Sequence, residues 1–175
     1  FIMSILNLVY APAKVLEKKA HEVKNIDKSL KSFVNNMFDT MYKNNGVGLA
    51  APQVNESLQV IVMDCSSKNK ESNPRVLLNP KIINQSDTCK EYEEGCLSFP
   101  DHYFSISRPD SLNVKFLDLE GNKKETFFSG FEAVCVQHEI DHLSGTLFTS
   151  YISRLKRQII LKKMQKFKKN INKSI

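Results

Sequence analysis

One five-residue run near the C-terminal end constrains this chain more than any other feature: His138-Glu139-Ile140-Asp141-His142. Residues four apart on an α-helix share one face, so the two histidines can direct their imidazoles at the same metal ion. Glu139 leaves the helix about 100° around from His138, close enough to take a proton from a water at that metal. The run therefore predicts a helix here and indicates metal-assisted hydrolysis.

A catalytic metal site of this kind usually has a third protein ligand. In the metzincin proteases the pattern continues to a third histidine, but that position here is Phe148, whose ring cannot bind a metal. Other zinc proteases use a downstream glutamate, and no Asp or Glu follows Asp141. The third ligand must therefore come from an earlier part of the chain.

The earlier candidate is a cysteine. None of the four cysteines belongs to a C-x-x-C pair, which argues against a structural zinc ribbon. Cys135 lies on the same predicted helix as the histidines and is expected to pack in the core. Cys96 follows Gly95 and precedes Leu97, in a segment suited to a bend beside a site. Spacing alone leaves open whether Cys96 is the third ligand.

Three segments together resemble the signature segments of the peptide deformylase family, in the same order. They are GVGLAAPQ at 46–53, EGCLS at 94–98 and QHEIDH at 137–142. The resemblance covers residues 3–151 and is greatest to the bacterial type with a helical C-terminal extension. It implies a metal-dependent hydrolase that removes the N-formyl group from the initiator formyl-methionine of nascent polypeptides and releases formate.

The resemblance also implies a metal centre. Cys96, His138 and His142 would bind one metal ion per chain, natively Fe²⁺, for which Zn²⁺, Ni²⁺ or Co²⁺ can substitute. Thiolate and imidazole ligands agree with a first-row transition metal, whereas Mg²⁺ or Ca²⁺ would need oxygen ligands. Ligand type alone does not separate Fe²⁺ from Zn²⁺.

Three catalytic roles follow from the same resemblance. Glu139 would accept a proton from the attacking water and deliver it to the departing amine. The side-chain amide of Gln53 and the backbone N–H of Leu97 would donate hydrogen bonds to the oxyanion that develops on the formyl group.

Further residues would contact or support the substrate. Glu94 would form a structural ion pair with Arg108 that supports the Cys96 segment. Tyr103 stands where many relatives carry a basic residue, which leaves preferences beyond methionine open. The implied substrate-binding residues are Val47, Gly48, Gly95, Val134 and Cys135, of which the last two would line the methionine pocket.

The pattern of apolar residues predicts an α+β fold. Apolar residues recur at helical spacing over 27–43, with Asp27 as the N-cap. Antiparallel β-sheets would pack around a central active-site helix, with N-terminal and C-terminal helices. Four segments are rich in β-forming residues: 58–63, 76–83, 112–119 and 125–128. Residues 120–122 are expected to form a turn, and 66–74 a surface loop.

Charge divides the chain into two parts. Residues 1–153 are expected to form a single catalytic domain, and 154–175 a basic C-terminal helical extension. The extension holds 9 of the 25 Lys and Arg and none of the 19 acidic residues. Its positive charge is therefore larger than the net charge of +6 of the whole chain. It would be either a solvated helix or a surface that docks on polyanion, and in relatives this extension contacts the ribosome.

The expected location is the cytoplasm, with no membrane and no sequence-specific nucleic acid as partners. No apolar run approaches the roughly 20 residues that span a bilayer, and no signal-peptide pattern opens the chain. Cysteines without a disulfide framework fit a reducing compartment.

Two other functions stay open at this point. A metalloendopeptidase would agree with the His-Glu-x-x-His run but lacks a downstream ligand. A non-catalytic RNA-binding module would agree with the basic extension but leaves the site residues unexplained. Release of formate from a formyl-methionyl peptide separates all three.

Overall fold

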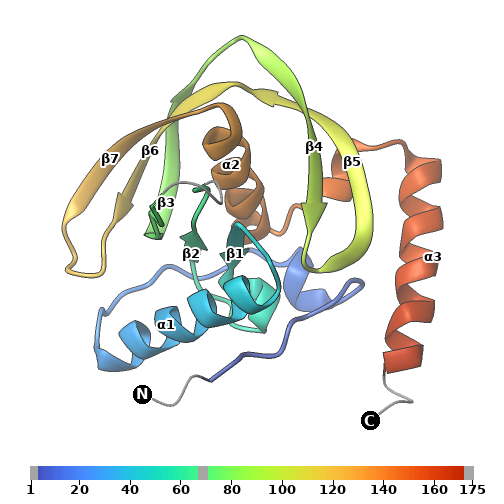
Figure 1. The fold of residues 1–175 in the computed structure, drawn as a ribbon, viewed down its shortest axis with the longest axis horizontal. Coiled ribbons are helices and arrows are strands. Elements are labelled where there is room, and N and C mark those ends of the chain that lie inside the picture. The colour runs from blue at the N-terminus through green and yellow to red at the C-terminus, as the bar shows by residue number, and fades with distance from the viewer. Residues whose placement is uncertain (1–3, 67–70, 172–175) are drawn as a thin grey trace.

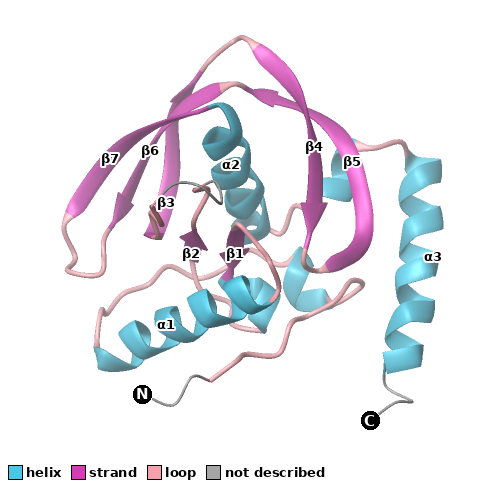
Figure 2. Cartoon of the chain, in the orientation of Figure 1, coloured by secondary structure: helices cyan, strands magenta, loops and turns pink. Residues whose placement is uncertain are grey.

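The computed structural model describes residues 4–66 and 71–171 and has the predicted α+β fold (Figures 1 and 2). The helices are α1 (Lys28–Lys43), α2 (Gly130–Ser144) and α3 (Arg154–Ile171). The strands are β1 (Gly48–Ala50), β2 (Val60–Met63), β3 (Arg75–Gln85), β4 (Cys89–Cys96), β5 (Phe99–Pro109), β6 (Ser111–Leu117) and β7 (Lys123–Ser129). Short 3₁₀ helices cover Lys14–Glu17, Ala51–Val54 and Phe148–Tyr151.

The strands form two antiparallel sheets. The five-stranded sheet has the order β1-β2-β3-β6-β7, and β4 and β5 form a separate two-stranded sheet. The long strands arch around α2, so that this helix lies between the two sheets (Figure 1). Antiparallel sheets around a central helix are what the sequence predicts.

Local signals account for the elements that the sequence predicts correctly. Asp27 caps α1, since its side chain accepts a hydrogen bond from the backbone N–H of Leu30 at 2.9 Å. The predicted strands fall on β2, β3, β6 and β7. The predicted turn between β6 and β7 is closed by Gly121, whose N–H bonds to the carbonyl of Asp118 at 3.1 Å. Of the predicted loop 66–74, residues 67–70 lie outside the described part.

The core is built on both sides of the five-stranded sheet. On one side, the apolar face of α1 covers the sheet with Leu30, Val34, Met37 and Met41. On the other side, α2 packs its buried residues against β2, β3, β6 and β7. Because every side chain of α2 from Ala133 to Glu139 is buried, these residues hold fixed positions.

The C-terminal helix packs on the rest of the protein through one face. Ile160 and Met164 are buried in a cluster with Leu16 and Phe148. Lys168 donates a hydrogen bond from Nζ to the carbonyl of Pro12 at 2.9 Å. The helix is therefore docked along one side rather than solvated all round.

Helix α3 begins at Arg154, and residues 172–175 of the extension lie outside the described part. The division into a catalytic domain and an extension stays a prediction. No helix within residues 4–66 and 71–171 has the length and apolar character to cross a membrane.

Candidate active site

Helix α2 ends just after the second histidine, and Gly145 ends it. This residue has a left-handed φ of 77°, and its N–H bonds to the carbonyl of His142 at 3.2 Å. A β-carbon there would lie 2.7 Å from backbone atoms of Glu17, so only glycine fits. Gly145 therefore serves as the C-terminal cap of α2.

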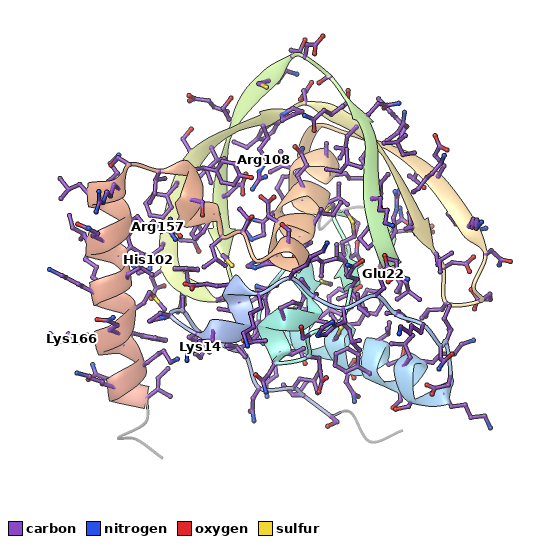
Figure 3. All side chains as sticks on the ribbon, turned by 180° about the vertical axis from the view of Figure 1, so that it is seen from behind. Lys14, Glu22, His102, Arg108, Arg157 and Lys166 are labelled. Carbon is purple, nitrogen blue, oxygen red and sulfur yellow. The ribbon has the colours of Figure 1, made fainter. Side chains whose placement is uncertain are left out.

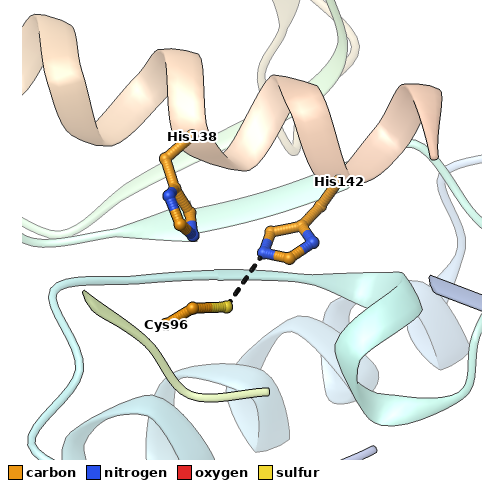
Figure 4. Close-up of side chains that lie close together, drawn as sticks. All are labelled: Cys96, His138 and His142. Atoms are coloured by element: carbon orange, nitrogen blue, oxygen red, sulfur yellow. Dashed lines mark hydrogen bonds between the residues drawn. The ribbon is translucent and has the colours of Figure 1, made fainter. Parts of the chain in front are cut away.

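Three potential metal ligands converge under α2. The donor atoms of Cys96, His138 and His142 lie within 4.8 Å of one another. The Cys96 Sγ lies 3.3 Å from Nε2 of His142, and both imidazoles descend from α2 toward the sulfur (Figure 4). Both histidines are buried and the cysteine is partly buried. A thiolate and two imidazoles at this separation suit one transition-metal ion.

The hairpin of β4 and β5 delivers the cysteine. The register pairs Gly95 with Tyr103 and Cys96 with Phe99, and it shifts between these two pairs. Such a shift bends the strand and re-aims the side chains that follow it. Cys96 thus ends β4 directly below the two histidines of α2.

Glu94 orients the first histidine. Its carboxylate accepts a hydrogen bond from Nδ1 of His138 at 2.9 Å, which leaves Nε2 free to bind a metal. The same carboxylate accepts two hydrogen bonds from Arg108, which also bonds to Asp141 at 2.9 Å. The predicted ion pair between Glu94 and Arg108 is present, and its direct contact with a candidate ligand is a finding that sequence reasoning missed.

Burial and hydrogen bonds shift the pKa values of the two histidines and of Glu94, which supports one of them. Burial alone would raise the pKa of Glu94, but hydrogen bonds from His138 and Arg108 hold it below the usual range. Burial lowers the pKa of His142 and keeps this imidazole neutral, the form that binds metals. Burial opposes the charge on His138, but hydrogen bonds to Cys96 and Glu94 raise its pKa.

Glu139 is buried beside these ligands. Burial raises the pKa of its carboxyl to about 7. Within the described residues its Oε2 atom has no hydrogen-bond partner, although it is inaccessible to solvent. A buried carboxylate oxygen of this kind requires a partner, and a water or metal-bound ligand in the adjacent cavity would supply one.

Gln53 points its amide nitrogen at the candidate metal site. Its Oε1 accepts a hydrogen bond from the N–H of Ala50 at 2.9 Å, which fixes the orientation of the amide. Its Nε2 then lies 3.5 Å from Sγ of Cys96 and 3.3 Å from Oγ of Ser98. This side chain is thus held as a hydrogen-bond donor toward the site.

A cavity of about 590 Å³ opens onto the site. Its wall includes Cys96 and His138, and His142 is not among its lining residues. The structure brings all the other predicted catalytic and substrate-binding residues to this wall: Val47, Gly48, Gln53, Gly95, Leu97, Val134, Cys135 and Glu139. Their individual roles stay predictions.

An antiparallel α+β fold whose central helix brings two histidines and a buried glutamate to a cysteine defines a metal-dependent hydrolase. A family model described as polypeptide deformylase matches residues 5–158. The chain belongs to the peptide deformylase family. It is a metalloenzyme that removes the N-formyl group from the initiator formyl-methionine of nascent polypeptides.

Relatives and solved structures agree with this assignment. The peptide deformylase of Maricaulis maris is 44% identical over 168 residues, which is 96% of this chain and 97% of the relative. The structure from Ehrlichia chaffeensis has a TM-score of 0.91 at 36% identity, covering 95% of this chain and 98% of that one. The structure from Legionella pneumophila has a TM-score of 0.88 at 43% identity, covering 97% and 98%.

Proposed function

We propose that deformylation takes place at a single Fe²⁺ ion bound by Cys96, His138 and His142. The observation that carries the proposal is the convergence of these three donors within 4.8 Å, beside a buried glutamate and an open cavity. When bound, such an ion supplies a Lewis acid that polarises the formyl carbonyl and makes water a nucleophile near neutral pH.

Glu139 transfers the protons. Its carboxylate takes a proton from the attacking water and later delivers it to the amine that leaves. A pKa of about 7 suits a group that must both accept and release a proton near neutrality.

Two donors stabilise the oxyanion that forms on the formyl oxygen. The Gln53 amide is already aimed at the site by its bond to Ala50, so little reorganisation is needed when charge develops. The backbone N–H of Leu97, the residue after the cysteine ligand, is the second donor.

The substrate lies in the cavity as an extended peptide. Val47 and Gly48 follow it with their backbone, Gly95 faces it from the hairpin, and Val134 and Cys135 contact the methionine side chain. Solved peptide deformylases support this placement: one from Acinetobacter baumannii is described with Met-Ala-Ser bound, and one from Ehrlichia chaffeensis is in complex with actinonin.

The identity of the ion rests on ligand chemistry. A thiolate with two imidazoles accepts Fe²⁺, and Zn²⁺, Ni²⁺ and Co²⁺ fit the same donors. Metal analysis of protein purified without oxygen is expected to find one iron per chain, and stoichiometric zinc in its place would contradict the assignment to iron.

One assay tests the activity against the alternatives. We expect formate release from formyl-Met-Ala-Ser and no cleavage of internal bonds in an unformylated peptide. Internal cleavage without formate would identify an endopeptidase instead. RNA binding without either activity would identify a non-catalytic module.

The basic extension 154–175 is proposed to bind the ribosome, which places the enzyme in the cytoplasm, where nascent chains emerge. Lys162, Lys163 and Lys166 are exposed on the side of α3 away from its buried face, and Lys166 projects away from the protein (Figure 3). Replacing all three by Glu should weaken binding to ribosomes, measured by co-sedimentation, at least tenfold. It should also reduce the salt dependence of binding, because a complex with fewer phosphate contacts releases fewer counterions when it forms.

The matched control reverses three exposed lysines elsewhere, Lys24, Lys28 and Lys43, with the same change in net charge. This control variant should bind ribosomes to within twofold of the wild-type protein. Equal weakening by both triple variants would show that net charge, and not the α3 surface, governs the association.

A further inference from the structure

Two cysteines from distant parts of the chain meet where strand β2 packs against helix α2 (Figure 1). Ile61 and Met63 of β2 lie on the α2 side of the sheet, because alternate side chains of a strand share one face. Cys65, two residues further, packs in the same cluster, which also contains Cys135 of α2. Both cysteines are free thiols, Cys135 buried and Cys65 partly buried.

One backbone carbonyl joins the two segments. The carbonyl of Val47 accepts a hydrogen bond from the N–H of Asp64 at 2.9 Å. It also accepts one from the thiol of Cys135, whose Sγ lies 3.6 Å away. Cys65 follows Asp64 directly, and a hydrogen bond links its thiol to that of Cys135. The two thiols therefore lie side by side, next to the start of β1.

The two thiols differ in accessibility. Cys65 is partly buried, so a small oxidant can reach it from solvent. The hydrogen bond to Cys65 and burial both raise the pKa of Cys135, which keeps its thiol protonated. An accessible thiol beside a second thiol is the arrangement in which a sulfenic acid condenses to a disulfide. Cys65 is therefore the thiol that an oxidant attacks, and Cys135 is its resolving partner.

We propose that Cys65 and Cys135 form a reversible disulfide that slows the enzyme under oxidising conditions. Hydrogen peroxide converts the Cys65 thiol to a sulfenic acid and releases one water molecule. The Cys135 sulfur then attacks that of Cys65, the S–S bond forms, and the thiol proton leaves with the hydroxyl group as a second water. The two thiols together lose two electrons, which reduce the peroxide. The effect on activity rests on the proposed function, whereas the disulfide itself does not.

The disulfide alters the wall of the active-site cavity. Cys135 lines this cavity, and a β-carbon on Gly48 would lie 2.9 Å from its Sγ, so the sulfur is tightly packed against β1. The sulfur atoms of a disulfide are about 2.05 Å apart, closer than those of two hydrogen-bonded thiols. Bond formation therefore shifts the Cys135 sulfur from its contact with Val47 and Gly48, in the pocket proposed for the methionine side chain.

Peptide mapping tests the disulfide without any turnover. The reduced enzyme is loaded with Zn²⁺, which has no redox chemistry, and treated with a small molar excess of hydrogen peroxide. Non-reducing digestion and mass spectrometry should find a peptide pair joined through Cys65 and Cys135, and dithiothreitol should separate it. Treatment that leaves both thiols reduced, or oxidises them to separate products, would overturn the proposal.

Formate release from formyl-Met-Ala-Ser measures the consequence. Oxidation should lower kcat/KM about tenfold, the effect of altering one contact in an apolar pocket, and dithiothreitol should restore it. Without peroxide, Cys65→Ser should stay within twofold of the wild-type kcat/KM, and peroxide should not lower it further. The matched control Cys89→Ser removes an exposed cysteine of β4 and should remain as sensitive to peroxide as the wild type.

The two proposals fail in different ways. If neither the reduced nor the oxidised enzyme releases formate, the proposed function fails, and the peptide map still decides whether the disulfide forms. If the reduced enzyme is active and the disulfide leaves kcat/KM unchanged, the inference alone is overturned. An equal loss of activity in peroxide-treated Cys65→Ser and wild type would also overturn it, because the loss would then arise at another group.

Discussion

The backbone of Gly48 lies directly against the carboxylate of Glu139. A β-carbon at position 48 would stand 2.6 Å from Oε1 of Glu139 and 2.9 Å from Sγ of Cys135. The first strand of the large sheet and the central helix therefore meet at the proposed proton-transfer group. Only glycine permits this approach.

Gly48→Ala should accordingly displace the Glu139 carboxylate. We expect kcat for formate release to fall at least tenfold, because proton transfer depends on placement to within a fraction of an ångström. Metal content should stay at one ion per chain, since no ligand is touched. Turnover within twofold of the wild-type rate would show that Glu139 acts from another position.

Glu94→Gln should weaken metal binding without removing a ligand. The substitution disturbs the bond to Nδ1 of His138 and leaves Arg108 without its buried partner. Changes of this kind typically cost 10–100-fold in metal affinity, which competition with a chelator measures. Glu91→Gln, on the same strand but exposed, serves as the control. Equal affinities in the two variants would reject an orienting role for Glu94.

Gln53→Ala should lower kcat by roughly a hundredfold, since one oxyanion donor contributes about 2.7–4 kcal/mol to the transition state. KM should change much less, because the donor acts chiefly when charge develops. Steady-state formate release measures both constants. A loss confined to KM would place Gln53 in substrate binding instead.

A buried carboxylate away from the site makes stability depend on pH. Burial alone would raise the pKa of Asp64, but hydrogen bonds from Ser66 and Ser72 hold it well below the usual range, with Tyr42 as a further donor. A depressed pKa in the folded state stabilises the protein above the unfolded value of about 3.9, and this contribution is lost as the pH falls below it.

Asp64→Asn should therefore lower the free energy of unfolding by about 2 kcal/mol at pH 7, the range of a hydrogen bond to a charged group. This loss of unfolding free energy should be the same at pH 5 as at pH 7 and smaller at pH 3, as measured by urea unfolding. Asp87→Asn, at an exposed position, should show no deficit. A deficit for Asp64→Asn that is unchanged at pH 3 would mean that charge is not its cause.

Features that neighbouring residues determine could be predicted from the sequence, whereas features that depend on contacts between distant residues could not. The cap at Asp27 and the helix that follows it are local, and so is the pair of histidines four residues apart. The hairpin of β4 and β5 was not predicted from propensity, because exposed polar residues such as Glu91 and Glu93 fill one of its faces. Its shape depends on packing over α2.

The contact between Glu94 and His138 joins residues 44 positions apart and could not be derived from spacing. One signal was available: Glu94 lies two residues before Cys96, and residues two apart on a strand share a face. This signal is incomplete, because the register shift between Gly95 and Cys96 re-aims the cysteine, yet both side chains face α2.

The packing of the C-terminal helix could not be predicted from its charge. The nine basic residues of the extension 154–175 agree equally with a free solvated helix and with a docked one. The structure distinguishes them, because Ile160 and Met164 are buried against the N-terminal segment. Deleting the helix would expose this cluster, so charge reversal is the cleaner test of ribosome binding.

The most direct test of the account is the metal content of Cys96→Ala beside the wild type, both purified without oxygen and measured by plasma mass spectrometry. The account predicts one transition-metal ion per wild-type chain and a large loss in the variant, with the fold preserved by circular dichroism. A variant that retains a full equivalent of metal would contradict the proposed three-ligand centre.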